Sequence, residues 1–160
     1  RRAGAGARLV AAERGAAEAW DAAAGLLVQA CDVEAEEADA WLAKAFGWSL
    51  WLAAGRPSYL EAKAEVPDPE RLRGDLAWLA GGPLALDRAQ LRQVVGACPQ
   101  AALRHPEERF ARSHASAPER LRHNFRDLVI SKPKVLELEW NCAGSCAARC
   151  SQCWHVGSHR

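Results

Sequence analysis

Four of the six cysteines lie close together near the C-terminal end of the sequence, spaced C-x3-C-x3-C-x2-C. They are Cys142, Cys146, Cys150 and Cys153, and His155 follows shortly after them. Thiolate and imidazole groups at this density are typical ligands of a tetrahedral structural Zn²⁺ site. A straight helix would separate Cys142 from Cys153 by about 16 Å, at about 1.5 Å per residue, so a shared metal requires a broken helix. The sequence therefore predicts a structural zinc site here, formed by four ligands of this set.

Two alternatives to zinc remain open for the same cysteines. Cys146, Cys150 and Cys153 have a spacing that also suits an iron–sulfur cluster held by thiolates. Disulfides or free thiols are the other alternative, and disulfides would form in an oxidising compartment. The remaining two cysteines, Cys31 and Cys98, lie on apolar helical faces, where we expect them to be buried as small hydrophobic residues.

A basic stretch between residues 104 and 134 is the second feature whose residue types could bind a partner. Its cations, interspersed with three histidines, are Arg104, Arg109, Arg112, Arg120, Arg122, Arg126, Lys132 and Lys134. Residues 101–160 carry 10 basic and 6 acidic side chains, whereas residues 1–100 carry 11 and 14, and the whole chain has a net charge of +1. Clustered cations are expected where a protein contacts the phosphates of a nucleic acid. A solvated helix face has the same composition, so both interpretations stay open.

No arrangement of residues in the sequence indicates catalysis. There is no glycine-rich phosphate loop and no H-E-x-x-H motif. His105, His114 and His123 lie in polar sequence without a surrounding motif, which is typical of surface histidines. We therefore predict a non-enzymatic protein without a small-molecule substrate. No apolar run approaches the roughly 18 residues of a membrane span, so no span is expected.

The composition predicts an all-α protein in which short helices position these groups. Alanine is abundant and threonine is absent, which favours helices over strands. The pattern predicts a helix over 16–31, with Asp32 capping the next helix, and a single helix after Pro118 that buries apolar residues as far as Val129. Asp68 and Asp87 are predicted N-caps of two further helices.

One phrase recurs along the chain: an amphipathic helix runs into a proline, and an apolar residue follows three positions later. The copies end at Arg56–Leu60, Cys98–Leu103 and Lys132–Leu136, and their prolines are 42 and then 34 residues apart. Periods of this length indicate a helical-repeat architecture. Such folds present extended surfaces to a partner, so the pattern favours a binding function.

The segment Leu84–Pro99 resembles one repeat of the mitochondrial transcription termination factor family (mTERF), with its leucine-rich helix and fixed proline. Phe46–Leu60 is similar to an earlier, degenerate copy, and Arg122–Leu136 to a later one. The resemblance covers roughly residues 40–138. It implies a short superhelix of helix–proline–turn–helix units with a basic concave surface, and members bind organellar DNA or RNA. The expected organisation is an N-terminal helical segment (1–33), mTERF-like repeats (34–139) and a Cys-rich tail (140–160).

The resemblance and the basic stretch together predict an organellar RNA-binding protein, with rRNA and neighbouring proteins of the mitochondrial ribosome as its partners. A protein-binding scaffold of an organellar complex and an organellar DNA-binding transcription factor are the alternatives. Arg1, Arg2, Arg8 and Arg14 in an alanine-rich setting resemble the edge of an organelle transit peptide, although an arbitrary fragment start explains them equally well. A mitochondrial location is expected, with the chloroplast as the alternative.

Overall fold

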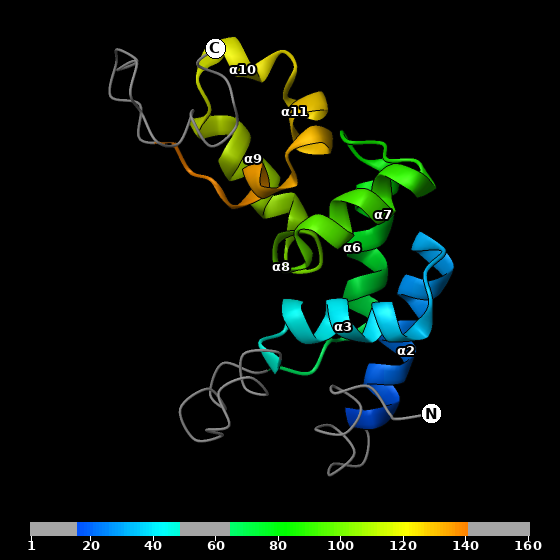
Figure 1. Cartoon of the computed structure of the whole chain (residues 1–160). Helices are drawn as coiled ribbons and strands as arrows, with labels where there is room; N and C mark the ends of the chain where they lie inside the picture. The colour runs from blue at the N-terminus through cyan, green and yellow to red at the C-terminus, as the bar shows by residue number, and fades with distance from the viewer. Residues whose placement is uncertain (1–15, 49–64, 141–160) are drawn as a thin grey trace.

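The regular elements of the protein are helices. The computed structural model describes residues 16–48 and 65–140, and this part contains eight α-helices, one 3₁₀ helix and no strand (Figure 1). In chain order they are α2 (Ala16–Cys31), α3 (Ala35–Ala45), α6 (Pro69–Gly81), α7 (Arg88–Ala97), α8 (Pro99–Ala102), α9 (Pro106–Ser116), α10 (Glu119–Arg122), α11 (Phe125–Ser131) and the 3₁₀ helix η2 (Pro133–Glu137). The all-α prediction is confirmed. Within the described residues, no helix combines the length and apolarity needed to cross a membrane.

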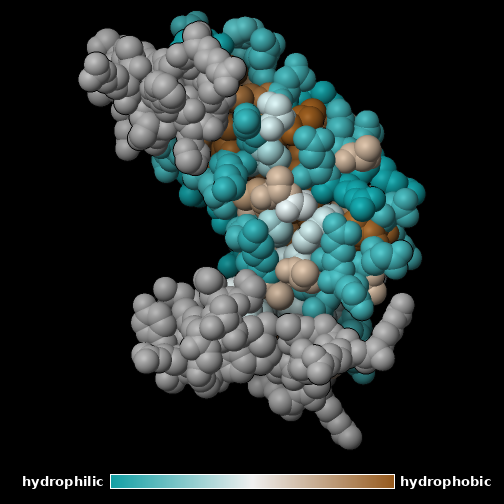
Figure 2. Space-filling model, viewed as in Figure 1, coloured by the Kyte–Doolittle hydropathy of each residue, from teal (hydrophilic) through white to brown (hydrophobic). Residues whose placement is uncertain are grey.

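The helices follow one another along the molecule. In Figure 1, α2 and α3 lie at one end, α6 and α7 in the middle, and α9 to α11 at the other end. Helix α2 packs against α3, α6 and α7, and α9 packs against α6 and η2, so one apolar core runs through the described residues. Figure 2 shows that the visible face of this part is mostly hydrophilic, with hydrophobic residues seen in places among the hydrophilic ones.

The N-terminal helix pair is closed by a buried tryptophan. Trp20 is 1 % exposed, and its indole Nε1 donates a hydrogen bond to Asp39 Oδ1 of α3 at 2.7 Å. The prediction that Asp32 caps the next helix is wrong. Asp32 ends α2 with a left-handed backbone (φ 54°) and donates its N–H to the Val28 carbonyl, whereas Glu34 occupies the N-cap of α3. A left-handed residue commonly closes a helix, and aspartate tolerates this conformation better than most residues.

The two other predicted caps are confirmed. The side chain of Asp68 accepts a hydrogen bond from the N–H of Glu70 at 3.0 Å. Asp87 and Gln90 form a reciprocal capping box at the start of α7, with bonds of 2.8 and 3.1 Å. Helix α6 ends at Gly81, and the cap position needs the glycine at Gly82 because a Cβ there would lie 2.6 Å from the Trp78 carbonyl oxygen.

Two copies of the recurring proline phrase have the same local backbone. Cys98 ends α7 with φ −144° and ψ 69°, and Lys132 ends α11 with φ −135° and ψ 73°. Each is followed by a proline at the first position of a short helix, because proline is tolerated there but not in a helix interior. The leucines that follow, Leu103 and Leu136, are both 2 % exposed. The first copy, Arg56–Leu60, lies outside the described residues.

The two copies also pack against each other. Helix α7 contacts α11, and α8 contacts η2, so corresponding elements of the two copies meet in the fold. The single helix predicted after Pro118 is wrong, since α10 ends at Arg122 and α11 begins at Phe125. Arg122 binds carbonyl oxygens at the end of α9, while Phe125 is buried among other aromatic rings, and these tertiary contacts separate the two short helices.

Candidate nucleic-acid interface

Two of the predicted phosphate-binding arginines have partners near the start of α9. The Arg104 guanidinium donates to Glu65 Oε2 at 2.7 Å and lies over the Phe46 ring, 5.5 Å from its centroid. Arg109 donates from Nε to the Arg104 carbonyl at 2.8 Å. Both guanidinium groups therefore hold the chain where α8 leads into α9.

Two further arginines hold the α10–α11 segment in place. Arg122 donates to the carbonyls of Ala117 and Ala115 at 2.8 and 3.1 Å. Arg126 donates from Nε to the Leu84 carbonyl at 2.6 Å and also approaches Asp127. Half of the eight predicted cations thus have a structural role within the chain.

Arg112, Lys132 and Lys134 are the predicted cations that stay available. All three are exposed, and none of their side chains makes a hydrogen bond or ion pair with the described residues. Lys132 and Lys134 line a pocket of about 300 Å³ at the start of η2. Arg112 lies on α9, which packs against η2 through a 2.6 Å hydrogen bond from Ser113 Oγ to the Val135 carbonyl.

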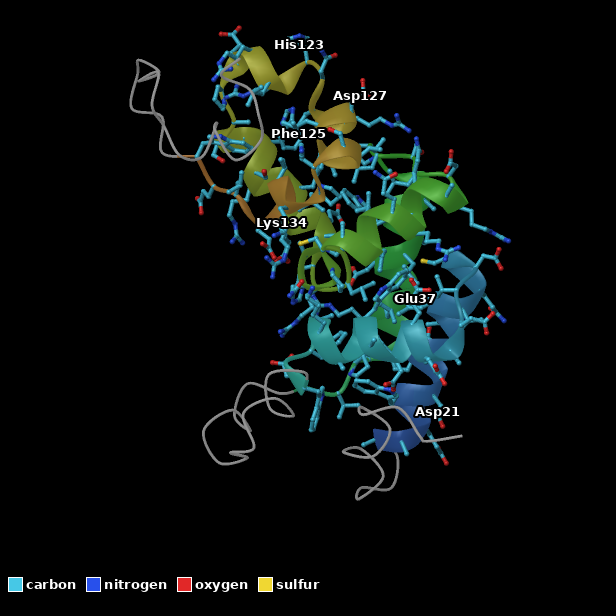
Figure 3. The ribbon with its side chains drawn as sticks, in the orientation of Figure 1. Asp21, Glu37, His123, Phe125, Asp127 and Lys134 are labelled. Atoms are coloured by element: carbon cyan, nitrogen blue, oxygen red, sulfur yellow. The ribbon has the colours of Figure 1, made fainter. Side chains whose placement is uncertain are left out.

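The structure does not gather all eight cations on one surface. Figure 3 shows His123, just after α10, and Lys134 of η2 well apart within the C-terminal half. Arg120 and Arg122 belong to the α10 end and are exposed, whereas the two lysines belong to the η2 end. The candidate interface is therefore reduced to the exposed cations of α9 and of the η2 end, Arg112, Lys132 and Lys134, called the α9–η2 surface below.

Sequence reasoning missed a second polar cluster, between α6 and the start of α9. The Arg71 guanidinium contacts His105 Nδ1 across 34 positions of sequence, and Asp75 lines the same pocket. Burial raises the pKa of the Asp75 carboxyl, an effect that nearby Arg71 and His105 oppose. No local motif joins these residues, because only the packing of α9 on α6 brings them together.

The chain matches no protein-family model, no curated protein and no solved structure. The mTERF resemblance therefore stays a prediction carried by its leucine and proline spacing.

The structural role of Arg126 leads to a stability prediction. We expect Arg126→Met to lower the free energy of unfolding by about 1 kcal/mol, because the Leu84 carbonyl loses a charge-assisted donor. Lys134→Met is the matched control, and we expect a change within about 0.5 kcal/mol because Lys134 is exposed. Urea denaturation followed by circular dichroism measures both variants. Equal stability of the two would contradict the structural role of Arg126.

The predicted zinc ligands lie outside the described residues. Among the residues that the structure does describe, no group of three or more His, Cys, Asp or Glu side chains is placed to hold a metal ion. Cys31 and Cys98 are buried, as predicted, and Cys98 Sγ donates to Glu137 Oε1 at 3.3 Å. Burial raises the pKa of both thiols to about 11, which opposes their use as thiolate ligands.

These two thiols predict a pH effect above neutrality. Because their pKa is higher in the folded chain than the ordinary 9.0, the fold holds their protons more tightly than the unfolded chain does. Their contribution to stability is thus complete below pH 9 and is lost as the pH rises towards 11. In a chain whose four tail cysteines are serine, we expect the free energy of unfolding to fall across this interval. Replacing Cys31 and Cys98 by alanine should make the free energy of unfolding less dependent on pH in this interval. An unchanged pH dependence would contradict the assignment of the effect to these two thiols.

Proposed function

We propose that the protein is a non-enzymatic, organellar RNA-binding helical-repeat protein that contacts rRNA as a structural subunit of the mitochondrial ribosome. The observation that carries the RNA-binding part is the α9–η2 surface, whose three cations are exposed and have no partner among the described residues. Phosphate contacts need cations that are free to exchange their counterions. The ribosomal assignment and the mitochondrial location come from the mTERF resemblance.

The repeated proline phrase supports the proposed superhelix. The copies around Pro99 and Pro133 have matching cap geometry, and their corresponding helices are in contact. Units that pack through equivalent surfaces can continue in one direction, which is how helical repeats build an elongated binding face. In this proposal, residues 34–139 form the repeat array.

The charge distribution supports an oriented contact with a polyanion. Residues 16–48 carry seven acidic side chains and one basic side chain, whereas residues 101–140 carry six acidic and eight basic. Figure 3 shows Asp21 at the α2 end of the molecule and His123 at the opposite end, with Glu37 and Lys134 between them. RNA would be attracted to the C-terminal half and repelled by the α2–α3 pair, which fixes the orientation of binding.

Salt-dependent RNA binding tests the proposal. The probe is a fluorescein-labelled single-stranded RNA, and the quantity measured is the slope of the logarithm of the binding constant against the logarithm of the salt concentration. We expect the magnitude of this slope to fall by about 2 in the triple variant Arg112→Ala, Lys132→Ala, Lys134→Ala, because about 0.7 is lost per phosphate contact. Fluorescence anisotropy between low and moderate salt measures the slope. The control variant Lys44→Ala, Arg73→Ala, Arg88→Ala removes three other exposed cations with the same change in net charge.

The outcomes separate the candidate functions. If the salt slope of RNA binding fell equally in both triple variants, net charge alone would govern binding, and the α9–η2 surface would have no special role. Equal affinity for DNA of the same sequence would favour the organellar transcription factor. Absence of any RNA binding would favour the protein-binding scaffold, which the strongly acidic α2–α3 pair also suits because it could attract a basic protein partner.

We also propose that the tail cysteines bind one structural Zn²⁺ ion. Cys31 and Cys98 are buried with raised pKa values, so a bound metal would fall to Cys142, Cys146, Cys150 and Cys153 or to His155. Elemental analysis of the native protein tests this, with about one zinc per chain expected. Iron in the sample would indicate the iron–sulfur alternative, and a metal-free sample would indicate thiol or disulfide chemistry.

A further inference from the structure

A pocket with a volume of about 210 Å³ lies beside the N-terminal half of α6. Helix α6 supplies Arg71 and Asp75 to its lining, and the loop between α8 and α9 supplies Arg104 and His105. Pockets for drug-sized ligands measure roughly 300–1,000 Å³, so this one suits a smaller, single ring system. It is separate from the α9–η2 surface.

Asp75 provides the open acceptor of this pocket. The neighbouring acids are already engaged, since Glu65 binds Arg104 and Asp68 caps α6. Asp75 is half-buried, and its side chain makes no hydrogen bond or ion pair with the described residues, although Arg71 and His105 lie close enough to lower its pKa. An ionised carboxylate only accepts hydrogen bonds, and its two oxygens can receive two donors side by side. A ligand with two adjacent N–H groups would satisfy it.

Arg71 provides donors one helical turn away. Its guanidinium contacts His105 Nδ1, and an arginine side chain carries five N–H donors in all. His105 has a left-handed backbone (φ 56°, ψ 51°), a conformation that needs support from the surrounding structure and that fixes where α9 begins. The other N–H groups of Arg71 remain for an acceptor on the ligand.

Planar and apolar groups complete the pocket. The Arg104 guanidinium covers the Phe46 ring, and Leu72 and Leu103 also line the pocket. Unpaired RNA bases stack on guanidinium groups and aromatic rings, and their edges are read by hydrogen bonds. Phe46 is 8 % exposed and already covered by Arg104, so the Arg104 guanidinium is the planar group left for a base to stack on, beside the acceptor and the donor of α6.

We propose that this pocket binds one unpaired guanine base of a single-stranded RNA. Guanine is the one base among the four whose Watson–Crick edge presents two adjacent N–H donors, at N1 and N2, next to an acceptor, O6. Asp75 accepts from N1 and N2, and Arg71 donates to O6. This inference rests on the proposed RNA-binding function and adds a base preference that phosphate contacts do not provide.

Two labelled oligonucleotides test the preference: a uridine 12-mer and the same 12-mer with one central guanosine. We expect the guanosine-containing RNA to bind the wild-type protein about 10- to 100-fold more tightly, as for a good bidentate base contact. Asp75→Asn should bring the ratio of the two affinities to about 1 and leave the affinity for the uridine 12-mer unchanged. Asp21→Asn, at an exposed carboxylate of α2, is the matched control and should retain the ratio.

A second measurement keeps the pocket testable without any RNA chain. Guanosine 5′-monophosphate, titrated into the wild-type protein, should shift the NMR signals of His105, whereas adenosine 5′-monophosphate should not. Equal affinity for both oligonucleotides with no response to the guanosine nucleotide overturns the pocket and leaves the proposed function intact. A response to this nucleotide without RNA binding overturns the proposed function and the RNA part of this inference, and leaves only the recognition of guanine by the pocket. Occupation of the pocket by an arginine-containing peptide, with no response to the nucleotide, overturns the inference in favour of a protein partner.

Discussion

Replacing Trp20 by alanine is expected to lower the free energy of unfolding by about 3–5 kcal/mol. Trp20 is 1 % exposed and belongs to the core where α2 meets α3, α6 and α7. The change removes the ring from this core and also leaves Asp39 without the indole donor that it binds at 2.7 Å. Since small domains are stable by only about 5–15 kcal/mol, the variant should be largely unfolded at moderate temperature. Thermal and urea denaturation followed by circular dichroism measure the effect.

Trp20→Phe separates the two contributions. It keeps an aromatic ring in the core but removes the Nε1 donor, so we expect a loss of about 1–3 kcal/mol from the unpaired Asp39 carboxylate and the smaller ring. A combined Trp20→Phe, Asp39→Leu variant should recover part of that loss, because no unpaired acceptor remains. If Trp20→Ala and Trp20→Phe were equally destabilising, packing of the ring would not be the main contribution.

Replacing Phe125 by alanine is the second large expected effect, again about 3–5 kcal/mol. Phe125 is 2 % exposed and contacts aromatic rings of α9 and of Trp140, which follows η2. Its ring centroid lies 5.4 Å from Phe110, 5.1 Å from His114 and 6.3 Å from Trp140, in edge-to-face arrangements. Such pairs contribute about 0.5–1.5 kcal/mol each beyond the buried area. Because α11 leads directly into η2, the variant should also weaken RNA binding at the α9–η2 surface.

Phe125→Leu is the matched control, since leucine fills much of the volume without the ring. We expect it to lower the free energy of unfolding less than the alanine change does. Its remaining loss relative to the wild-type protein reports the edge-to-face contacts. Under conditions where Phe125→Leu stays folded, its salt slope for RNA binding should equal that of the wild-type protein, because Arg112, Lys132 and Lys134 are unchanged. A lower slope in this folded variant would mean that the aromatic cluster positions the cations.

The sequence alone determined the helical class and several helix boundaries. The predicted helix over 16–31 is confirmed, and so are the N-caps at Asp68 and Asp87. These features are local: alanine content, a proline at the first helical position and a capping side chain act within one or two turns. The end of a helix before Pro99 and Pro133 was predictable for the same reason, since proline cannot continue a helix.

Tertiary structure alone decided which charged groups remain available to a partner. Arg104, Arg109, Arg122 and Arg126 resemble Arg112 and Lys134 in the sequence, yet the fold directs their guanidinium groups to carbonyl and carboxylate oxygens. Arg126 reaches a carbonyl that is 42 positions away, and Arg71 meets His105 across 34. Arg109 and Arg122 bind carbonyls only five positions away. For the arginines with distant partners, the partner depends on how remote segments pack, and no local spacing encodes it. Helix starts follow from nearby residues, whereas the α9–η2 surface and the Asp75 pocket exist only once α9 has packed against α6 and η2.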